Sequence, residues 1–161
     1  MKNFVNIRDI PSKDLRKILI DAKSRKKIRN NKNTLQVDKG SPLKDKLLIQ
    51  MFEKSSLRTR LSFYLAIRQL GGSAITLRPD EIHLGRDGEN ISDIAKIVSV
   101  YGDAFMLRTD NEKKLSNFSN YINIPLINGL SPDSHPAQII SDIFTIEEVK
   151  KKKISNLTIC W

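Results

Sequence analysis

Blocks of apolar residues alternate with blocks of amphipathic spacing along this chain. Continuous apolar runs, typical of strands buried on both faces, lie at residues 47–52, 104–107 and 124–127. Apolar residues three or four apart, typical of helices, lie at residues 59–70, 91–101, 112–121 and 136–144. An earlier amphipathic helix follows Pro11, with Ser12 as its expected N-cap. We therefore predict an α/β fold, a four-stranded or slightly larger parallel sheet with helices on both faces.

The loop after the first apolar run carries the most chemistry. Ser56-Leu57-Arg58-Thr59-Arg60 places two hydroxyls and two guanidinium groups where a strand meets a helix. The N–H groups of a helix's first turn lack intrahelical partners, and the helix dipole favours an anion there. Arg58 can add a charge-assisted bond, and Ser56 and Thr59 can donate to a phosphate. Alternatively, Ser56 only caps the helix and Arg58 lies on its solvated face.

Polar residues also follow the other two predicted strands. Arg108 ends one of them, and Asn128-Gly129-Leu130 and then His135 follow the other. In parallel sheets ligands bind outside the carboxyl ends of the strands. We therefore expect Arg58, Arg108 and His135 to converge on one small anion. The alternative for His135 is a buried residue that only caps the following helix.

These motifs resemble those of the aspartate/ornithine transcarbamoylase family, over essentially the whole chain. The family's phosphate motif, Phe-x-x-x-Ser-Thr-Arg-Thr-Arg, is similar to Phe52-Glu53-Lys54-Ser55-Ser56-Leu57-Arg58-Thr59-Arg60. Other similar segments are Leu70-Gly71-Gly72, Asp80-Glu81-Ile82-His83-Leu84-Gly85, Asp93-x-Ala95, Arg108, Asn128-Gly129-Leu130 and His135-Pro136-x-Gln138 with Asp142. The segments at 80–85 and 128–130 favour the ornithine branch.

The chain departs from the family pattern at two places. Leu57 stands where the family has Thr, which removes one hydroxyl from the phosphate loop. If that position offers only its backbone N–H, Leu is tolerated. If its side chain donates, the loss costs about 0.5–1.5 kcal/mol of substrate binding. The loop at residues 85–89 is also longer than is usual in the family.

The resemblance implies transfer of the carbamoyl group of carbamoyl phosphate to the side-chain amine of ornithine, a step of arginine biosynthesis. The implied carbamoyl phosphate contacts are Ser56, Leu57, Arg58, Thr59, Arg108, Leu130, His135 and Gln138. Arg108, His135 and Thr59 are the expected catalytic groups, since donors there stabilise charge on the carbonyl oxygen. No general base, cofactor or metal is expected if the departing phosphate takes the amine proton. An acylated ornithine or aspartate is the alternative acceptor.

The resemblance also implies two domains. Residues 1–150 are expected to form the carbamoyl phosphate-binding domain, and residues 151–161 a crossover and the first strand of an absent amino-acid-binding domain. The basic run at residues 150–153 fits this crossover, and it equally fits a solvated helix end with cations at the negative pole of the dipole. We expect this chain alone to be inactive, because the acceptor site would be missing.

The segment at residues 78–90 holds Ile82 and Leu84 beside His83, and a free surface loop has little reason to carry such apolar residues. The resemblance implies that this loop reaches the phosphate site of a neighbouring subunit in a cyclic homotrimer, with His83 acting in trans. The alternative is an ordinary mobile loop on a monomer.

The formal net charge of +10 is also typical of nucleic-acid binders. However, the basic segment at residues 23–29 contains no aromatic residues, and no zinc-ligand spacing is present. The positive field of the protein would equally steer a phosphate substrate, so the net charge does not distinguish the two partners. Since no nucleic-acid-binding pattern accompanies the charge, we expect no nucleic-acid partner. A non-catalytic basic binding module that keeps the fold is the remaining alternative.

Several other sequence features predict a cytoplasmic protein. The single cysteine, Cys160, excludes an internal disulfide and is expected in the core. The N-terminal residues include Lys2, Arg8 and Asp9 and contain no apolar stretch long enough for a signal peptide or membrane span. His83 and His135 are far apart in the sequence, so no metal site is expected.

Overall fold

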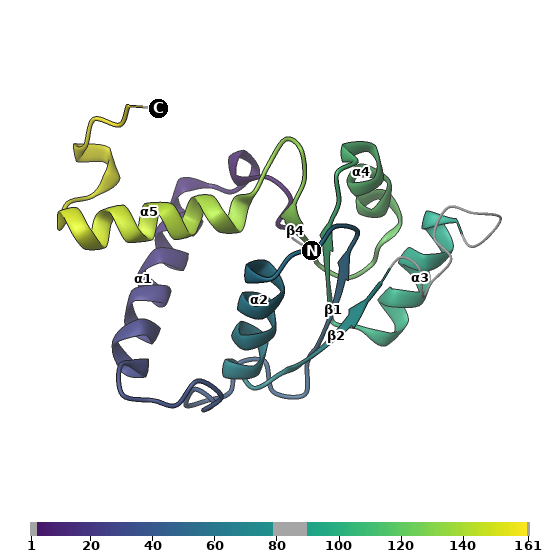
Figure 1. The fold of residues 1–161 in the computed structure, drawn as a ribbon, viewed down its shortest axis with the longest axis horizontal. Coiled ribbons are helices and arrows are strands. Elements are labelled where there is room, and N and C mark those ends of the chain that lie inside the picture. The colour runs from purple at the N-terminus through teal and green to yellow at the C-terminus, as the bar shows by residue number, and fades with distance from the viewer. Residues whose placement is uncertain (1–2, 79–89, 161) are drawn as a thin grey trace.

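The computed structural model describes residues 3–78 and 90–160, and it contains a four-stranded parallel sheet. The strands are β1 (Leu47–Phe52), β2 (Ser73–Leu77), β3 (Ala104–Arg108) and β4 (Leu126–Leu130). They lie in the order β2-β1-β3-β4 (Figure 1). The α-helices are α1 (Ser12–Arg29), α2 (Arg58–Gln69), α3 (Ile91–Tyr101), α4 (Glu112–Tyr121) and α5 (Pro136–Lys150), and short 3-10 turns span Ile7–Asp9 and Ile154–Asn156. The predicted α/β class is confirmed.

Most predicted elements are found within a residue or two of their expected bounds, with four exceptions. α5 continues to Lys150, beyond the expected end at residue 144. Ser12 is the first residue of α1 rather than its cap, because Pro11 occupies the cap position. β4 begins at Leu126 and runs to Leu130, so Asn128 and Gly129 lie inside the strand rather than after it. β2 was not located from the sequence, because its residues are exposed or half-buried and show no continuous apolar run.

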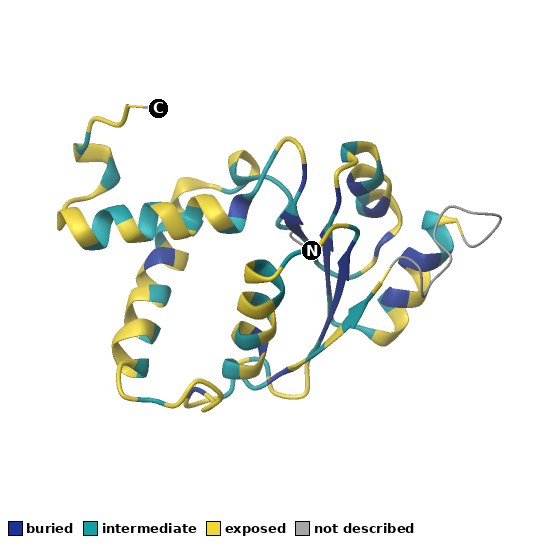
Figure 2. Cartoon of the chain, in the orientation of Figure 1, coloured by how far each residue is buried: buried dark blue, intermediate teal, exposed yellow. Residues whose placement is uncertain are grey.

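Alternate side chains of β1 enter two separate cores. Ile49 and Met51 face α3 and α4, which contribute Val98 and Phe118 among others to the larger cluster. Leu48 and Phe52 face α2 on the opposite side of the sheet. Burying a large aliphatic side chain contributes about 1.5–3 kcal/mol, so these two clusters hold the layers together. Figure 2 shows the buried residues concentrated in the central strands.

The N-terminal segment covers the open edge of β4. The Phe4 N–H donates to the Leu126 carbonyl at 2.7 Å, and the Asn128 N–H donates to the Phe4 carbonyl at 2.9 Å. An uncovered edge strand offers a row of unpaired backbone groups to other chains. This short parallel bridge satisfies part of that edge beside the strand that ends near the site.

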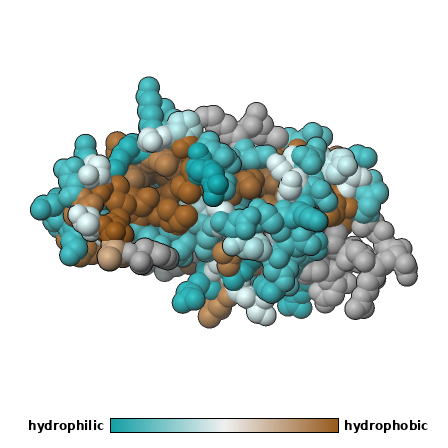
Figure 3. All heavy atoms as spheres, turned by 90° about the horizontal axis from the view of Figure 1, so that it is seen from above, coloured by the Kyte–Doolittle hydropathy of each residue, from teal (hydrophilic) through white to brown (hydrophobic). Residues whose placement is uncertain are grey.

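Helix α5 continues well past the sheet and contacts α1 through ion pairs. Arg16 lies 2.6 Å from Glu147, and Lys26 lies 2.6 Å from Glu148. Apolar atoms gather on the surface at one end of the molecule (Figure 3). In α5 itself, Ile139 and Val149 are exposed. Surface ion pairs contribute little stability, so they orient α5 more than they hold it.

The last described residues, 157–160, form no strand, and the Cys160 side chain is exposed. The expectation of a core cysteine is therefore wrong: α5 ends at Lys150 with Lys151 in a left-handed conformation, and the chain then leaves the body of the domain. The assignment of residues 151–161 to a crossover and second domain stays a prediction. None of the helices in the described ranges is long and apolar enough to cross a membrane.

Candidate active site

The ends of β1 and β3 meet at the point where the chain order of the sheet reverses. In the sheet, β1 lies between β2 on one side and β3 on the other. Phe52 and Arg108 are register partners at the carboxyl ends of these two strands. Such a switch point opens a crevice where parallel α/β sheets bind their ligands. The geometry therefore places the loop after β1 beside Arg108.

Arg108 crosses this crevice and binds the β1–α2 loop. Its Nη1 donates to Ser56 Oγ at 3.0 Å and to Thr59 Oγ1 at 2.9 Å. Ser56, Thr59 and Arg108 are all half-buried. The structure thus brings together two hydroxyls and a guanidinium that the sequence predicted to share a site, although they come from two different strand ends.

The N-terminus of α2 carries no side-chain cap. Leu57 occupies the cap position and its side chain is exposed at 74%. Ser56 accepts a hydrogen bond from Arg108 instead of capping the helix, so the capping interpretation of Ser56 is wrong. The first-turn N–H groups of Arg58, Thr59 and Arg60 have no intrahelical acceptor and point out of the helix beside the two hydroxyls. This arrangement suits an anion.

A hollow of about 370 Å³ lies at this helix end, lined by Ser55, Ser56, Leu57, Arg58 and Arg108. Arg58 is exposed at its rim, whereas the Arg60 guanidinium lies 5.2 Å from the ring centroid of Phe52 and is held against that ring. A second hollow lies on the other side of Arg108 and includes Thr109, Leu130 and Ser131 in its lining. Arg108 therefore contributes to the lining of both hollows.

A β-bulge shapes the strand that borders the second hollow. The pairing of β3 with β4 shifts at Arg108, which lies opposite Leu130 because Gly129 is skipped. A side chain at Gly129 would place its Cβ 2.3 Å from Met106 Sδ, so the buried Met106 side chain would have to shift to admit it. Leu130 has a φ of 138°, a conformation that costs a non-glycine residue free energy. Its carbonyl accepts the Thr109 N–H at 3.1 Å and keeps a second lone pair for a ligand.

The buried Asn128 side chain supports the loop between β4 and α5. The sequence did not reveal this supporting role. Asn128 Nδ2 donates to the Val5 carbonyl at 3.1 Å, to Ser131 Oγ at 2.9 Å and to the Ser134 carbonyl at 3.1 Å. Its Oδ1 accepts the Leu130 N–H at 2.9 Å. These bonds fix the path of the chain from the bulge to His135.

His135 occupies the cap position of α5, is half-buried and makes no capping hydrogen bond through its side chain to the described residues. His135 is thus the N-cap residue of α5, and its carbonyl accepts the Ile139 N–H at 3.1 Å, but its side chain is neither fully buried nor used for capping. Burial and the positive charge of Arg108 lower the pKa of its imidazole, and Asp142 opposes them. A neutral imidazole at pH 7 presents one N–H donor and one acceptor. Neither of the two hollows beside Arg108 has His135 in its lining.

Gln138 lies in the first turn of α5 and is exposed. Its Nε2 donates to Asp142 Oδ1 at 2.8 Å, which turns the amide so that its oxygen can accept from a ligand. Asp142 therefore orients Gln138 and acts on the charge of His135. His83, the residue expected to act in trans, lies outside the described residues.

Sequence reasoning passed over Glu53, which lies directly behind the anion-binding loop. It accepts hydrogen bonds from the Thr109 hydroxyl and the Lys114 ammonium. Its only sequence signal is its place in the phosphate motif. Within the ranges that the structure describes, no three His, Cys, Asp or Glu side chains cluster as metal ligands would.

The chain is similar to known carbamoyltransferases. A family model described as aspartate/ornithine carbamoyltransferase, carbamoyl-P binding domain, matches residues 2–148. An ornithine carbamoyltransferase of Caulobacter vibrioides is 42% identical over 160 residues, which are 99% of this chain and 51% of that protein.

Solved structures share the fold. The ornithine carbamoyltransferase of Pyrococcus furiosus superimposes with a TM-score of 0.84 at 36% identity, covering 94% of this chain and 46% of that one. The catalytic subunit of M. jannaschii aspartate transcarbamoylase has a TM-score of 0.80 at 30% identity, covering 94% and 48%. The chain spans about half the length of these proteins. It belongs to the aspartate/ornithine carbamoyltransferase family and matches that family's carbamoyl phosphate-binding domain.

Proposed function

We propose that this chain is the carbamoyl phosphate-binding part of an ornithine carbamoyltransferase. The observation that carries the proposal is the contact of Arg108 with both Ser56 and Thr59 beside the uncapped start of α2. This arrangement gathers hydroxyl, guanidinium and backbone N–H donors at one strand end, as a doubly charged phosphate requires. The similarity to ornithine carbamoyltransferases supports the choice of ligand.

The phosphate group would bind in the hollow at the start of α2. Ser56 donates its hydroxyl hydrogen to the phosphate oxygens, Leu57 and Thr59 contribute their backbone N–H groups, and Arg58 closes the rim. Arg108 already holds the two hydroxyl oxygens as acceptors, which leaves their hydrogens directed elsewhere. The site is therefore organised before the ligand arrives, and less binding free energy is spent on ordering it.

The carbamoyl group would lie over Arg108 toward the second hollow. Arg108, His135 and Thr59 donate to its carbonyl oxygen, where negative charge develops in the tetrahedral transition state. Gln138 Oε1 and the Leu130 carbonyl accept from its NH2. His135 serves this role as a neutral donor, since burial and Arg108 lower its pKa.

The reaction is attack by the uncharged amine of ornithine on the carbonyl carbon. The new C–N bond forms, the bond from that carbon to the bridging phosphate oxygen breaks, and phosphate leaves with the electron pair. The departing phosphate takes the amine proton, so the protein supplies no general base. The products are citrulline and phosphate, and the step belongs to arginine biosynthesis in the cytoplasm.

The acceptor is proposed as ornithine on the segments at 80–85 and 128–130 and on the similarity of this chain to ornithine carbamoyltransferases. Aspartate is the alternative acceptor, since an aspartate transcarbamoylase shares the fold. The chain spans about half the length of its relatives, and we propose that the acceptor binds mainly in the other half, so turnover would need it. We also propose a homotrimer in which His83 of one subunit completes the neighbouring site.

Calorimetric titration of the chain with carbamoyl phosphate tests the proposed binding role. Thr59→Val keeps the shape of the side chain but removes its hydroxyl from Arg108 and from the ligand, and we expect affinity to fall about tenfold. Thr145→Val is the matched control, because the Thr145 hydroxyl only donates to the Ser141 carbonyl within α5. Equal affinities for Thr59→Val and wild type would contradict the assignment.

A further inference from the structure

Glu53 joins the two loops that form the anion site. It follows Phe52 at the end of β1, and its backbone N–H donates to the Arg108 carbonyl at 3.0 Å. Its side chain is only 10% exposed and accepts the Thr109 hydroxyl on one oxygen and the Lys114 ammonium on the other. One residue thus contacts both Arg108 and the residue after it.

These contacts close into a ring that includes the start of α4. Thr109 is buried, and its Oγ1 also accepts the Asn111 N–H at 3.1 Å. Asn111 caps α4 by accepting the Lys114 N–H at 3.1 Å. Because Lys114 returns to Glu53, the ring passes through four residues and holds the β3–α4 loop against the β1–α2 loop.

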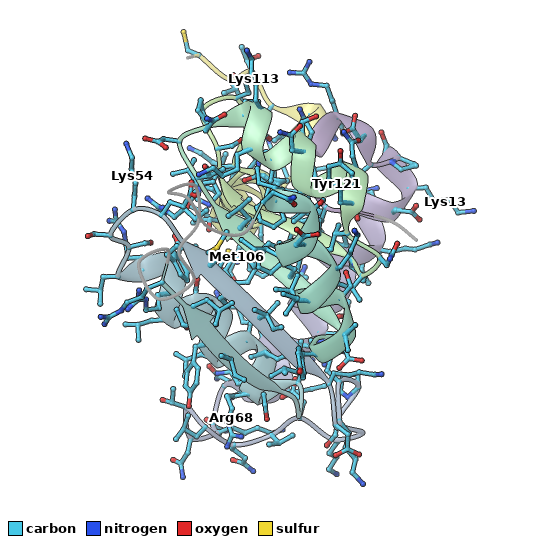
Figure 4. The ribbon with its side chains drawn as sticks, turned by 90° about the vertical axis from the view of Figure 1, so that its right-hand side faces the viewer. Lys13, Lys54, Arg68, Met106, Lys113 and Tyr121 are labelled. Atoms are coloured by element: carbon cyan, nitrogen blue, oxygen red, sulfur yellow. The ribbon has the colours of Figure 1, made fainter. Side chains whose placement is uncertain are left out.

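The charge of Glu53 needs this ring. A carboxylate beside a phosphate site would repel its ligand unless its charge is compensated. Here one carboxylate oxygen accepts the Thr109 hydroxyl and the other accepts the Lys114 ammonium, so the Lys114 charge in α4 compensates the negative charge of Glu53. The next residue, Lys54, behaves differently: it projects from the molecule (Figure 4) and forms an exposed pair with Asp110 at 2.7 Å. The buried pair, unlike the exposed one, leaves an uncompensated charge when one partner is removed.

We infer that Glu53 is a positioning residue for the carbamoyl phosphate site, acting through Thr109 to hold Arg108 at the distance where it reaches Ser56 and Thr59. The inference rests on the proposed function for its ligand. Glu53 does not line the hollow proposed for the phosphate; it sets the separation of the two loops that do. Loss of the ring would let the β3–α4 loop move away from the start of α2 and break the contacts of the Arg108 guanidinium.

Two measurements on Glu53→Gln test the inference. In the ligand-free chain, ¹⁵N relaxation of the Arg108 Nε–H group should show a less ordered guanidinium than in wild type. Calorimetric titration at a temperature where circular dichroism shows a folded chain should show carbamoyl phosphate binding at least tenfold weaker. The matched control is Glu147→Gln, which removes a paired carboxylate at the far end of α5 and should change neither readout.

A double-mutant cycle separates positioning from general destabilisation. If Glu53 acts through Thr109, then Glu53→Gln combined with Thr109→Val should bind no more than about twofold weaker than Glu53→Gln alone. Fully additive losses, or an Arg108 side chain that stays as ordered as in wild type, would overturn the inference. If wild type binds no carbamoyl phosphate, the proposed function fails, and the relaxation measurement still decides whether Glu53 holds Arg108.

Discussion

Arg108 Nη1 lies 2.9 Å from Thr59 Oγ1, and this hydrogen bond joins the end of β3 to the first turn of α2. The two residues are far apart in the sequence, and only the parallel pairing of β1 with β3 brings them together. The contact spans the crevice in which a ligand would bind. A site with this bond already formed loses little entropy when the ligand arrives, and changes to either residue should therefore affect binding directly.

The pKa of His135 should depend on Arg108. Burial and the Arg108 charge both lower this pKa below the usual 6.5, so Arg108→Met should raise it. NMR titration of the imidazole Cε1–H resonance measures the change, and His83→Gln identifies the signal because the chain has two histidines. A pKa unchanged by Arg108→Met would show that the two groups do not share a crevice.

The lowered pKa of His135 also determines how the free energy of unfolding changes with pH. A histidine whose folded-state pKa is lowered binds fewer protons when folded than when unfolded. The contribution of His135 to the free energy of unfolding is therefore fully present above the pKa of the unfolded state, near 6.5. It is lost as the pH falls through the lower pKa of the folded state. Arg108→Met should weaken this pH dependence of stability, since it brings the folded-state pKa of His135 closer to the unfolded-state pKa.

The chain should become more stable when Gln50 is replaced by methionine. Gln50 is fully buried in β1, and neither its Nε2 nor its Oε1 has a hydrogen-bond partner among the described residues. An unsatisfied buried polar group costs about 1–3 kcal/mol. Because methionine has a similar volume, we expect Gln50→Met to raise the free energy of unfolding by about that amount in urea denaturation.

Gln69→Met is the control for this prediction. The Gln69 amide donates to the Thr34 carbonyl at 2.9 Å, so its loss should leave stability unchanged or lower it. A Gln50→Met chain less stable than wild type would mean that the Gln50 amide makes favourable interactions that the structure does not contain.

Restoring the family's hydroxyl at residue 57 should strengthen phosphate binding. Leu57 is exposed at the anion-binding hollow, and Leu57→Thr would place one more donor there at little cost in packing. One hydrogen bond contributes about 0.5–1.5 kcal/mol, which corresponds to roughly twofold to tenfold in affinity. Leu57→Val, which has the shape of threonine without its hydroxyl, is the control. Equal affinities for the two variants would show that residue 57 contributes through its backbone alone.

Elements with a strong local pattern were predictable from the sequence. β1 and α3 lie at their expected bounds because their apolar patterns are strong, and α4 is also found where its weaker pattern predicted it. β2 has no such pattern, and its place in the sheet depends on pairing with β1. Asn128 is polar yet buried inside β4, because its Nδ2 donates tertiary hydrogen bonds to the Val5 carbonyl and to Ser131 Oγ. No local rule reveals such a residue.

The sequence was enough to predict which residues form the candidate site, but not which hydrogen-bond partners they have. Ser56, Thr59 and Arg108 could be named because hydroxyls and guanidiniums at strand ends suit phosphate. That Ser56 binds Arg108 rather than capping α2 depends on a distant strand, so local capping rules gave the wrong partner. Glu53 was missed for the same reason, since its partners Thr109 and Lys114 lie on another loop and helix.

The central claim is that Arg108 organises a carbamoyl phosphate site, and titration calorimetry of Arg108→Lys tests it most directly. Lysine keeps the positive charge but cannot reproduce the planar fork that reaches Ser56 and Thr59. Arg68→Lys is the control, because Arg68 is exposed in the last turn of α2, well away from Lys54 beside the site (Figure 4). We predict binding at least tenfold weaker for Arg108→Lys and unchanged for Arg68→Lys. Wild-type affinity in Arg108→Lys, or no binding of carbamoyl phosphate by wild type, would contradict the account.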